Sequence, residues 1–107
     1  MVVGERSLSL GETTLAVRVH APVEVGSHWE CQYEIDWPDG ATLRAASGVD
    51  ALQALQLTFQ MIALELYTSP YHEAGELNWP GAGGGYGFSA PKDLRDVLIG
   101  DDKRFDG

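Results

Sequence analysis

One segment constrains the fold more than any other. Residues 28–37 alternate strictly, with apolar side chains at odd positions and polar ones such as Glu30, Glu34 and Asp36 at even positions. Because successive side chains of a strand point to opposite faces of a sheet, this pattern predicts a half-buried strand. One face of that strand is expected to be dry, and the other is expected to be wet and acidic.

Three further segments, residues 5–10, 14–20 and 41–47, also have strand-like patterns. In residues 14–20 the pattern directs Arg18 and His20 outward. Short connections favour pairing between sequential strands, so we expect a four-stranded antiparallel meander. The connection 21–27 contains Pro22 and Gly26 and is predicted to be a loop.

The sequence Pro38-Asp39-Gly40 separates the last two predicted strands. Residues that face each other across a ladder must share a face of the sheet. A three-residue loop satisfies this rule, with proline first and glycine in the left-handed position of a bulge. It would place Ala41 and Leu43 on the dry face.

A long helix is predicted over residues 49–68. Asp50 can cap its start, and Gln53 three residues later completes a capping-box pattern, while Pro70 blocks continuation. Its apolar residues form two stripes on different sides. The stripe expected to face the sheet is Leu52, Leu55, Phe59, Ile62 and Leu66; the second is Ala54, Leu57, Met61 and Leu64.

These elements predict an α+β fold, with the meander packed on one long helix. The chain after residue 76 is rich in glycine and carries Trp79, Tyr86 and Phe88, which predicts a C-terminal strap anchored by aromatic side chains. We expect a single domain over residues 1–90, followed by a charged tail, 91–107, that can form a short helix. A homodimer face at Leu57, Met61 and Leu64 is predicted to share the cover of the second stripe with this strap.

Sixteen acidic residues against seven basic ones give a net charge of −9. A surface this negative repels phosphate, which argues against nucleic acid and anionic membranes as partners. No apolar run approaches the 18 or so residues of a membrane span, and no secretory signal is evident. We therefore expect a cytoplasmic protein whose partner is a basic protein.

The residues that could carry chemistry form no recognisable catalytic or metal-binding set, so we predict no catalytic residue, no metal and no cofactor. Cys31 could be a thiol nucleophile, but its parity places it on the dry face, where cysteine is an inert hydrophobe. The three histidines have no i, i+4 helical spacing. The glycines of 81–87 lack the strand–helix context of a phosphate loop.

Two functions follow from these observations. The first is a non-catalytic interaction module, an adaptor or antidote to a basic protein, that uses an acidic face at Glu30, Glu34 and Asp36. The alternative is a small enzyme or ligand-binding protein with a pocket near the helix start and the glycine-rich loop. The candidate ligand-binding residues are Asp50, Gln53, His72, Trp79 and Tyr86.

Several motifs together resemble one known family. They are W-E-C-x-Y-x-I from residue 29, G-V-D-A-L-Q-A-L-Q-L from residue 48, E-L-Y-T-S from residue 65, and L-N-W from residue 77 with a later G-F. The combination is similar to a family of small bacterial proteins that is known only as a domain of unknown function. The resemblance spans about residues 5–88 and implies one compact domain in a bacterial cytoplasm. It implies no activity, substrate or catalytic residue.

Overall fold

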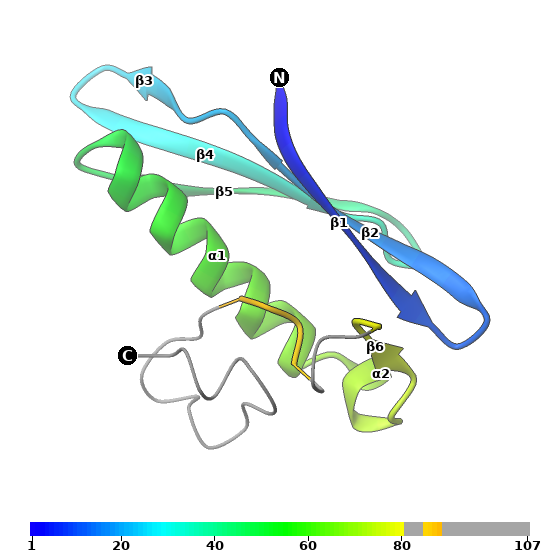
Figure 1. Ribbon diagram of the computed structural model, residues 1–107. Helices are drawn as coiled ribbons and strands as arrows, with labels where there is room; N and C mark the ends of the chain where they lie inside the picture. The colour runs from blue at the N-terminus through cyan, green and yellow to red at the C-terminus, as the bar shows by residue number, and fades with distance from the viewer. Residues whose placement is uncertain (81–84, 89–107) are drawn as a thin grey trace. The chain divides into compact units, whose positions relative to one another are not determined.

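The structure is a computed structural model that describes residues 1–80 and 85–88 (Figure 1). It has a mixed α+β fold, as predicted, with an antiparallel sheet and one main helix. In chain order the elements are β1 (Val2–Leu10), β2 (Thr13–His20), β3 (Val23–Val25), β4 (His28–Ile35), β5 (Thr42–Gly48), α1 (Ala51–Tyr67), α2 (Pro70–Glu73) and β6 (Leu77–Asn78). The predicted tail, residues 91–107, lies outside the described residues.

The chain forms two compact units. The first contains Met1–Ser7 and Leu15–Thr58, and the second contains Leu8–Thr14 and the described residues from Phe59 onward. Strands β1 and β2 and helix α1 each have residues in both units.

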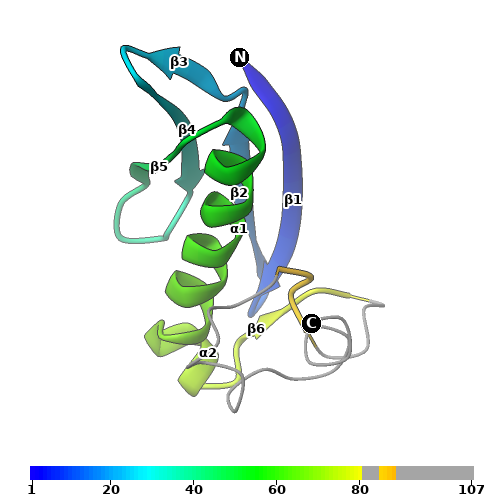
Figure 2. The same cartoon turned by 90° about the vertical axis from the view of Figure 1, so that its left-hand side faces the viewer.

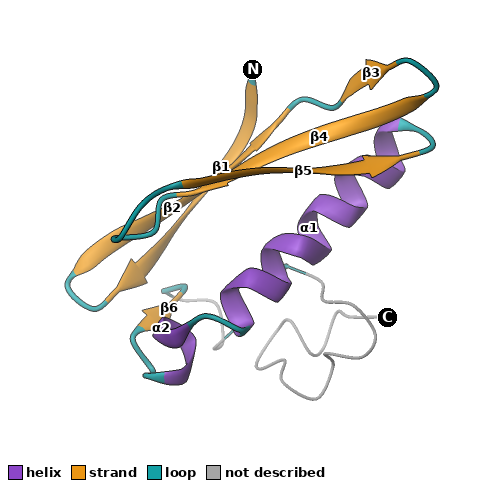
Figure 3. Cartoon of the chain, turned by 180° about the vertical axis from the view of Figure 1, so that it is seen from behind, coloured by secondary structure: helices purple, strands orange, loops and turns teal. Residues whose placement is uncertain are grey.

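Strand β4 is the centre of the first unit. It pairs with β5 over residues 29–35, with β3 over residues 28–30 and with β2 over residues 33–35. Because β5 occupies one edge of β4 over residues 29–35, β2 and β3 must share the other edge. These neighbours can be followed in Figure 2 and, from behind, in Figure 3.

The prediction of a loop over residues 21–27 is wrong. Val23–Val25 forms β3, which turns back at Gly26 and pairs with the start of β4. Gly26 has a φ of 60°, a left-handed conformation that glycine adopts without steric cost. Pro22 precedes this strand rather than interrupting it, so the proline does not prevent pairing.

The predicted register between β4 and β5 is also wrong. The Gly40 N–H donates to the Trp37 carbonyl at 3.0 Å, which closes a turn with only Pro38 and Asp39 at its centre. A loop of two residues pairs odd positions with even ones, so Glu34 lies opposite Leu43. Leu43 is therefore on the wet face, and its exposed fraction is 60%.

The dry face of β4 is confirmed. Cys31, Tyr33 and Ile35 are all 0% exposed. Partners on β2 and β5 continue this buried surface, because Val17 lies opposite Ile35 and Ala46 lies opposite Cys31. Burial of this alternating set is what specifies the face of the strand.

The start of α1 is capped by Asp50 and Gln53 as predicted, although the return bond reaches Val49 rather than Asp50 itself. The Gln53 N–H donates to Asp50 Oδ1 at 2.8 Å, and the Val49 N–H donates to Gln53 Oε1 at 2.7 Å. Two N–H groups that have no partner within the helix are satisfied in this way. The helix ends at Tyr67, before Pro70 begins α2.

The predicted rotation of α1 is wrong in the first unit. Leu52, assigned to the sheet-facing stripe, is 77% exposed, whereas Ala54 and Thr58 are fully buried. Thr58 Oγ1 lies 2.9 Å from the Ala54 carbonyl oxygen and 3.3 Å from that of Cys31 on β4. A small residue and a hydroxyl therefore make the helix–sheet contact, which allows a close approach that leucine would prevent.

In the second unit the end of β1 pairs with β6, a strand that the sequence pattern did not predict. Ser9 lies opposite Asn78 and Leu10 lies opposite Leu77. Tyr86 and Phe88 are buried; the Tyr86 ring lies 4.8 Å from that of Tyr67, and the Phe88 ring lies 6.1 Å from that of Phe59.

Candidate functional site

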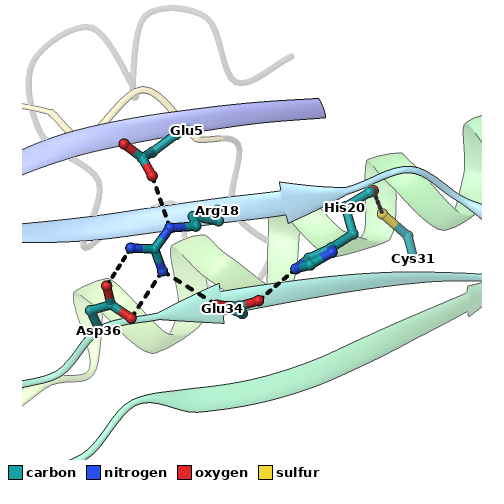
Figure 4. A network of polar contacts seen from close by, with 6 residues as sticks. All are labelled: Glu5, Arg18, His20, Cys31, Glu34 and Asp36. Atoms are coloured by element: carbon teal, nitrogen blue, oxygen red, sulfur yellow. Dashed lines mark hydrogen bonds and ion pairs between the residues drawn. The ribbon is translucent and has the colours of Figure 1, made fainter. Parts of the chain in front are cut away.

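A group of polar side chains in the first unit gathers around Arg18, on the face of the sheet opposite the dry face. We call this side the outer face. Residues Glu5, Arg18, His20, Glu34 and Asp36 form the Arg18 network (Figure 4).

The register of the strands brings this network together. Arg18 lies directly opposite Glu34 in the pairing of β2 with β4. His20 and Asp36 are each two residues from one of these positions, so they project from the same face. Glu5 enters from β1. Strand alternation and the register between β2 and β4 therefore account for the cluster except Glu5, which also requires β1 to lie beside β2.

Arg18 binds three carboxylates. Its Nη1 and Nη2 donate to the two oxygens of Asp36 at 3.1 and 2.7 Å, a bidentate pair. Its Nε donates to Glu5 at 2.8 Å, and Nη1 also donates to Glu34 at 3.3 Å. The planar guanidinium suits this fork-like arrangement, which lysine could not reproduce.

The charges in this cluster do not cancel. One guanidinium and three carboxylates leave a net charge of −2 when His20 is neutral. The hydrogen bond from Arg18 lowers the pKa of Asp36, and the hydrogen bonds to Asp36 and then Glu5 raise the pKa of Arg18. Both shifts favour the charged forms, so Arg18 and Asp36 form an ion pair at neutral pH.

Two histidines also pair with acids in the first unit. His20 Nε2 lies 2.6 Å from Glu34 Oε1, and His28 Nε2 lies 3.0 Å from Glu30 Oε2. In each pair the Nε2–H of the imidazole donates in the tautomer that carries a proton there, and the carboxylate oxygen accepts. The predicted acidic residues Glu30, Glu34 and Asp36 thus all have basic side chains beside them.

Cys31 is a buried thiol, as its parity predicted. Its sulfur lies 3.3 Å from the His20 carbonyl oxygen, to which the S–H donates, and the residue is 0% exposed. A thiol in this position packs as a small hydrophobe.

The residues predicted to share a pocket fall into both units. Asp50 and Gln53 belong to the first, where each accepts a backbone hydrogen bond of the helix cap. His72, Trp79 and Tyr86 belong to the second. Within that unit His72 Nδ1 lies 2.6 Å from the Tyr86 hydroxyl, while Trp79 is half-buried. The pocket itself stays a prediction.

Tyr67, at the end of α1, is the member of this cluster that sequence reasoning missed. Its ring lies 5.0 Å from that of His72 at an interplanar angle of 69°, and 4.8 Å from that of Tyr86. Edge-to-face and tilted contacts of this kind stabilise aromatic clusters. The signal in the sequence was Pro70, which prevents α1 from continuing and begins α2, the helix that carries His72 close to Tyr67.

In the described ranges, 1–80 and 85–88, three or more His, Cys, Asp or Glu residues nowhere gather as a metal site would require. Within those same residues, none of the helices is both long and apolar enough to cross a membrane.

The fold and the Arg18 network define a small α+β domain with a charged, outward-facing sheet surface. The chain belongs to the family described as Domain of unknown function (DUF6968), whose model matches residues 4–90. Neither a curated protein nor a solved structure matches the chain.

The ion pair between Asp36 and Arg18 is expected to contribute to stability in a pH-dependent way. Asp36 has a lower pKa in the folded protein, so its pairing with Arg18 stabilises the fold above the unfolded-state pKa of about 3.9. That stability is lost as the pH falls through the lower, folded-state pKa. We expect Arg18→Met to lower the melting temperature most near neutral pH, and the difference from the parent to shrink below about pH 4.

The measurement is thermal unfolding followed by circular dichroism across this pH range. Gln32→Met is the matched control, because Gln32 is an exposed, uncharged residue of β4 that receives the same side chain. Its effect should not depend on pH. A constant deficit for Arg18→Met at every pH would show that the ion pairs do not contribute.

Proposed function

We propose that residues 1–90 act as one non-catalytic protein-interaction module, and that the outer face binds a basic protein. In this proposal the protein is an adaptor or antidote. The observation that carries it is the combination, on one sheet face, of surplus negative charge with exposed apolar side chains.

The charge of the outer face is negative even after its internal pairs are counted. Glu5, Glu30, Glu34 and Asp36 contribute four negative charges and Arg18 contributes one positive charge, so the sum is −3 with neutral histidines. The whole chain carries −9. A field of this sign raises the association rate of a cationic partner and repels an anionic one.

Apolar side chains lie among these charges. Leu43 is 60% exposed and lies opposite Glu34; Val23 is 53% exposed and lies opposite Glu30. Val25, opposite His28, is 41% exposed. Burial of such side chains supplies affinity that surface charge pairs alone do not, and apolar groups mixed with polar ones are typical of protein interfaces.

The test compares two variants that add the same charge at different places. Leu43→Arg adds a bulky cation to the outer face. Leu52→Arg adds it to the exposed side of α1, a helix that packs on the dry face. The parent and both variants are immobilised and used to capture proteins from cell extract at low and high salt, with identification by mass spectrometry.

We expect the parent and Leu52→Arg to capture the same basic protein at low salt, and Leu43→Arg to lose it. High salt should release it, since the Debye length falls to about 3 Å at 1 M. The proposal fails if the parent enriches no basic protein, or if Leu43→Arg retains what the parent binds.

Three other expectations stay predictions: the cytoplasmic location, the bacterial origin and the helix face for a homodimer. Of the residues of that face, Leu57 and Met61 are half-buried and Leu64 is 39% exposed.

A further inference from the structure

Strand β5 leaves one side of its backbone open. Within the described part of the chain it pairs with β4 on one side and with no strand on the other. An open edge of this kind is a template for pairing with another chain.

Neighbouring hydrogen bonds show which β5 residues face this open edge. The Asp36 N–H donates to the Ala16 carbonyl on the β2 side, so even positions of β4 direct their backbone groups toward β2. Odd positions therefore bond to β5, in agreement with the Trp37–Gly40 bond. Their partners are the even residues of β5. This alternation leaves the N–H and C=O groups of Leu43, Ala45 and Ser47 directed outward.

Nothing in the strand blocks this edge. Leu43, Ala45 and Ser47 are all exposed, and β5 contains neither proline nor lysine, the residues that commonly protect an edge strand. Six backbone groups, three donors and three acceptors, are thus available to another strand.

We propose that two copies of the chain pair through β5, antiparallel, about a twofold axis at Ala45. In this register Ala45 lies opposite its own copy and Leu43 lies opposite Ser47 of the partner subunit. All six outward backbone groups of each copy are then used, because the three residues are symmetric about the central one. An isologous contact of this kind closes on itself as a dimer.

The charge distribution favours a second copy as the occupant. β5 contains no acidic residue in a chain of net charge −9, and its one charge is Arg44. In the proposed register Arg44 lies opposite an alanine of the copy, so no like charges face each other directly. Arg44 also places positive charge near the seam between two strongly negative molecules.

Salt should affect the β5 dimer and the complex with a basic protein in opposite directions. Repulsion between two copies of charge −9 is screened as salt rises, so the dimer should strengthen. Binding of a basic protein should weaken. A contact of one short strand is also small beside a standard interface of about 1,600 Å², so the dimer is expected to depend on concentration. This inference does not rest on the proposed function.

The experiment measures molecular mass by analytical ultracentrifugation, over a range of protein concentrations at low and high salt. Ala45→Pro removes an outward N–H and leaves the bonds to β4 in place, a position where proline is tolerated. Leu64→Glu is the matched variant on the predicted helix face. Ala45→Lys is a second edge variant, which sets two lysines opposite each other if proline disturbs the strand.

We expect the parent to reach twice the monomer mass of 11.6 kDa at high concentration and high salt. Leu64→Glu should do the same, whereas folded Ala45→Pro and Ala45→Lys should stay at the monomer mass. A parent that is monomeric under every condition overturns the proposal. So does a dimer that survives both edge variants, and loss of the dimer in Leu64→Glu alone would assign it to the helix face.

Discussion

Replacing Ile35 by aspartate is expected to abolish folding. Ile35 is 0% exposed at the end of β4, and Val17 of β2 lies opposite it. Removing a large buried aliphatic side chain costs about 2–5 kcal/mol, and an unpaired carboxylate in the same place adds a further desolvation penalty. Native domains are stable by only about 5–15 kcal/mol, so the two losses together approach or exceed the whole stability.

The matched control is Gln32→Asp. It places the same side chain on the same strand but on the outer face, where Gln32 is exposed. Circular dichroism and urea unfolding should find this variant folded, with a free energy of unfolding close to that of the parent. Equal effects of the two substitutions would contradict the assignment of faces along β4.

Strand faces were predictable where the alternation is strict, because parity alone decides which side chains are buried. The register between paired strands was not predictable, since it depends on turn geometry. In the β4–β5 connection a turn over Pro38 and Asp39 replaces the expected loop of three residues and moves Leu43 to the outer face. One residue of difference in loop length changes the face of every side chain in the next strand.

Helix α1 shows a different limit of prediction from the sequence. Its cap follows from local hydrogen bonds between Asp50, Gln53 and the backbone, which sequence spacing encodes. Its rotation depends on the closest contact with β4, and that contact uses Ala54 and Thr58 rather than leucine. A pattern of large apolar residues cannot detect a contact made by small ones.

The candidate site was predictable in part for the same reason. Strand alternation placed Arg18 and His20 outward and placed Glu34 and Asp36 on the wet face of β4. The pairing that joins them is long-range, since Arg18 and Asp36 are 18 residues apart in the chain. It requires a register between β2 and β4 that the local pattern does not encode. Glu5 was missed because its own strand has only a weak pattern.

Strand β5 and helix α1 lie close together at Gly48. Gly48 ends β5, and a Cβ atom there would lie 2.5 Å from the Ala54 nitrogen and 2.9 Å from the Gln53 carbonyl carbon. Both are backbone atoms of α1, so no side chain can rotate away. We expect Gly48→Ala to destabilise the protein by about 1–3 kcal/mol, the typical cost of overpacking, and Gly48→Val to have a larger effect.

Gly4→Ala separates this steric effect from the general effect of replacing glycine. Gly4 lies in β1, and an added Cβ there would meet nothing within 4 Å. Neither Gly4 nor Gly48 has a left-handed φ, so backbone strain does not distinguish them. Gly4→Ala should therefore stabilise the protein by about 0.4–1 kcal/mol, because alanine has less conformational entropy to lose on folding. Urea unfolding measures both changes; if Gly48→Ala were also stabilising, α1 could not lie as close to β5 as its backbone distances require.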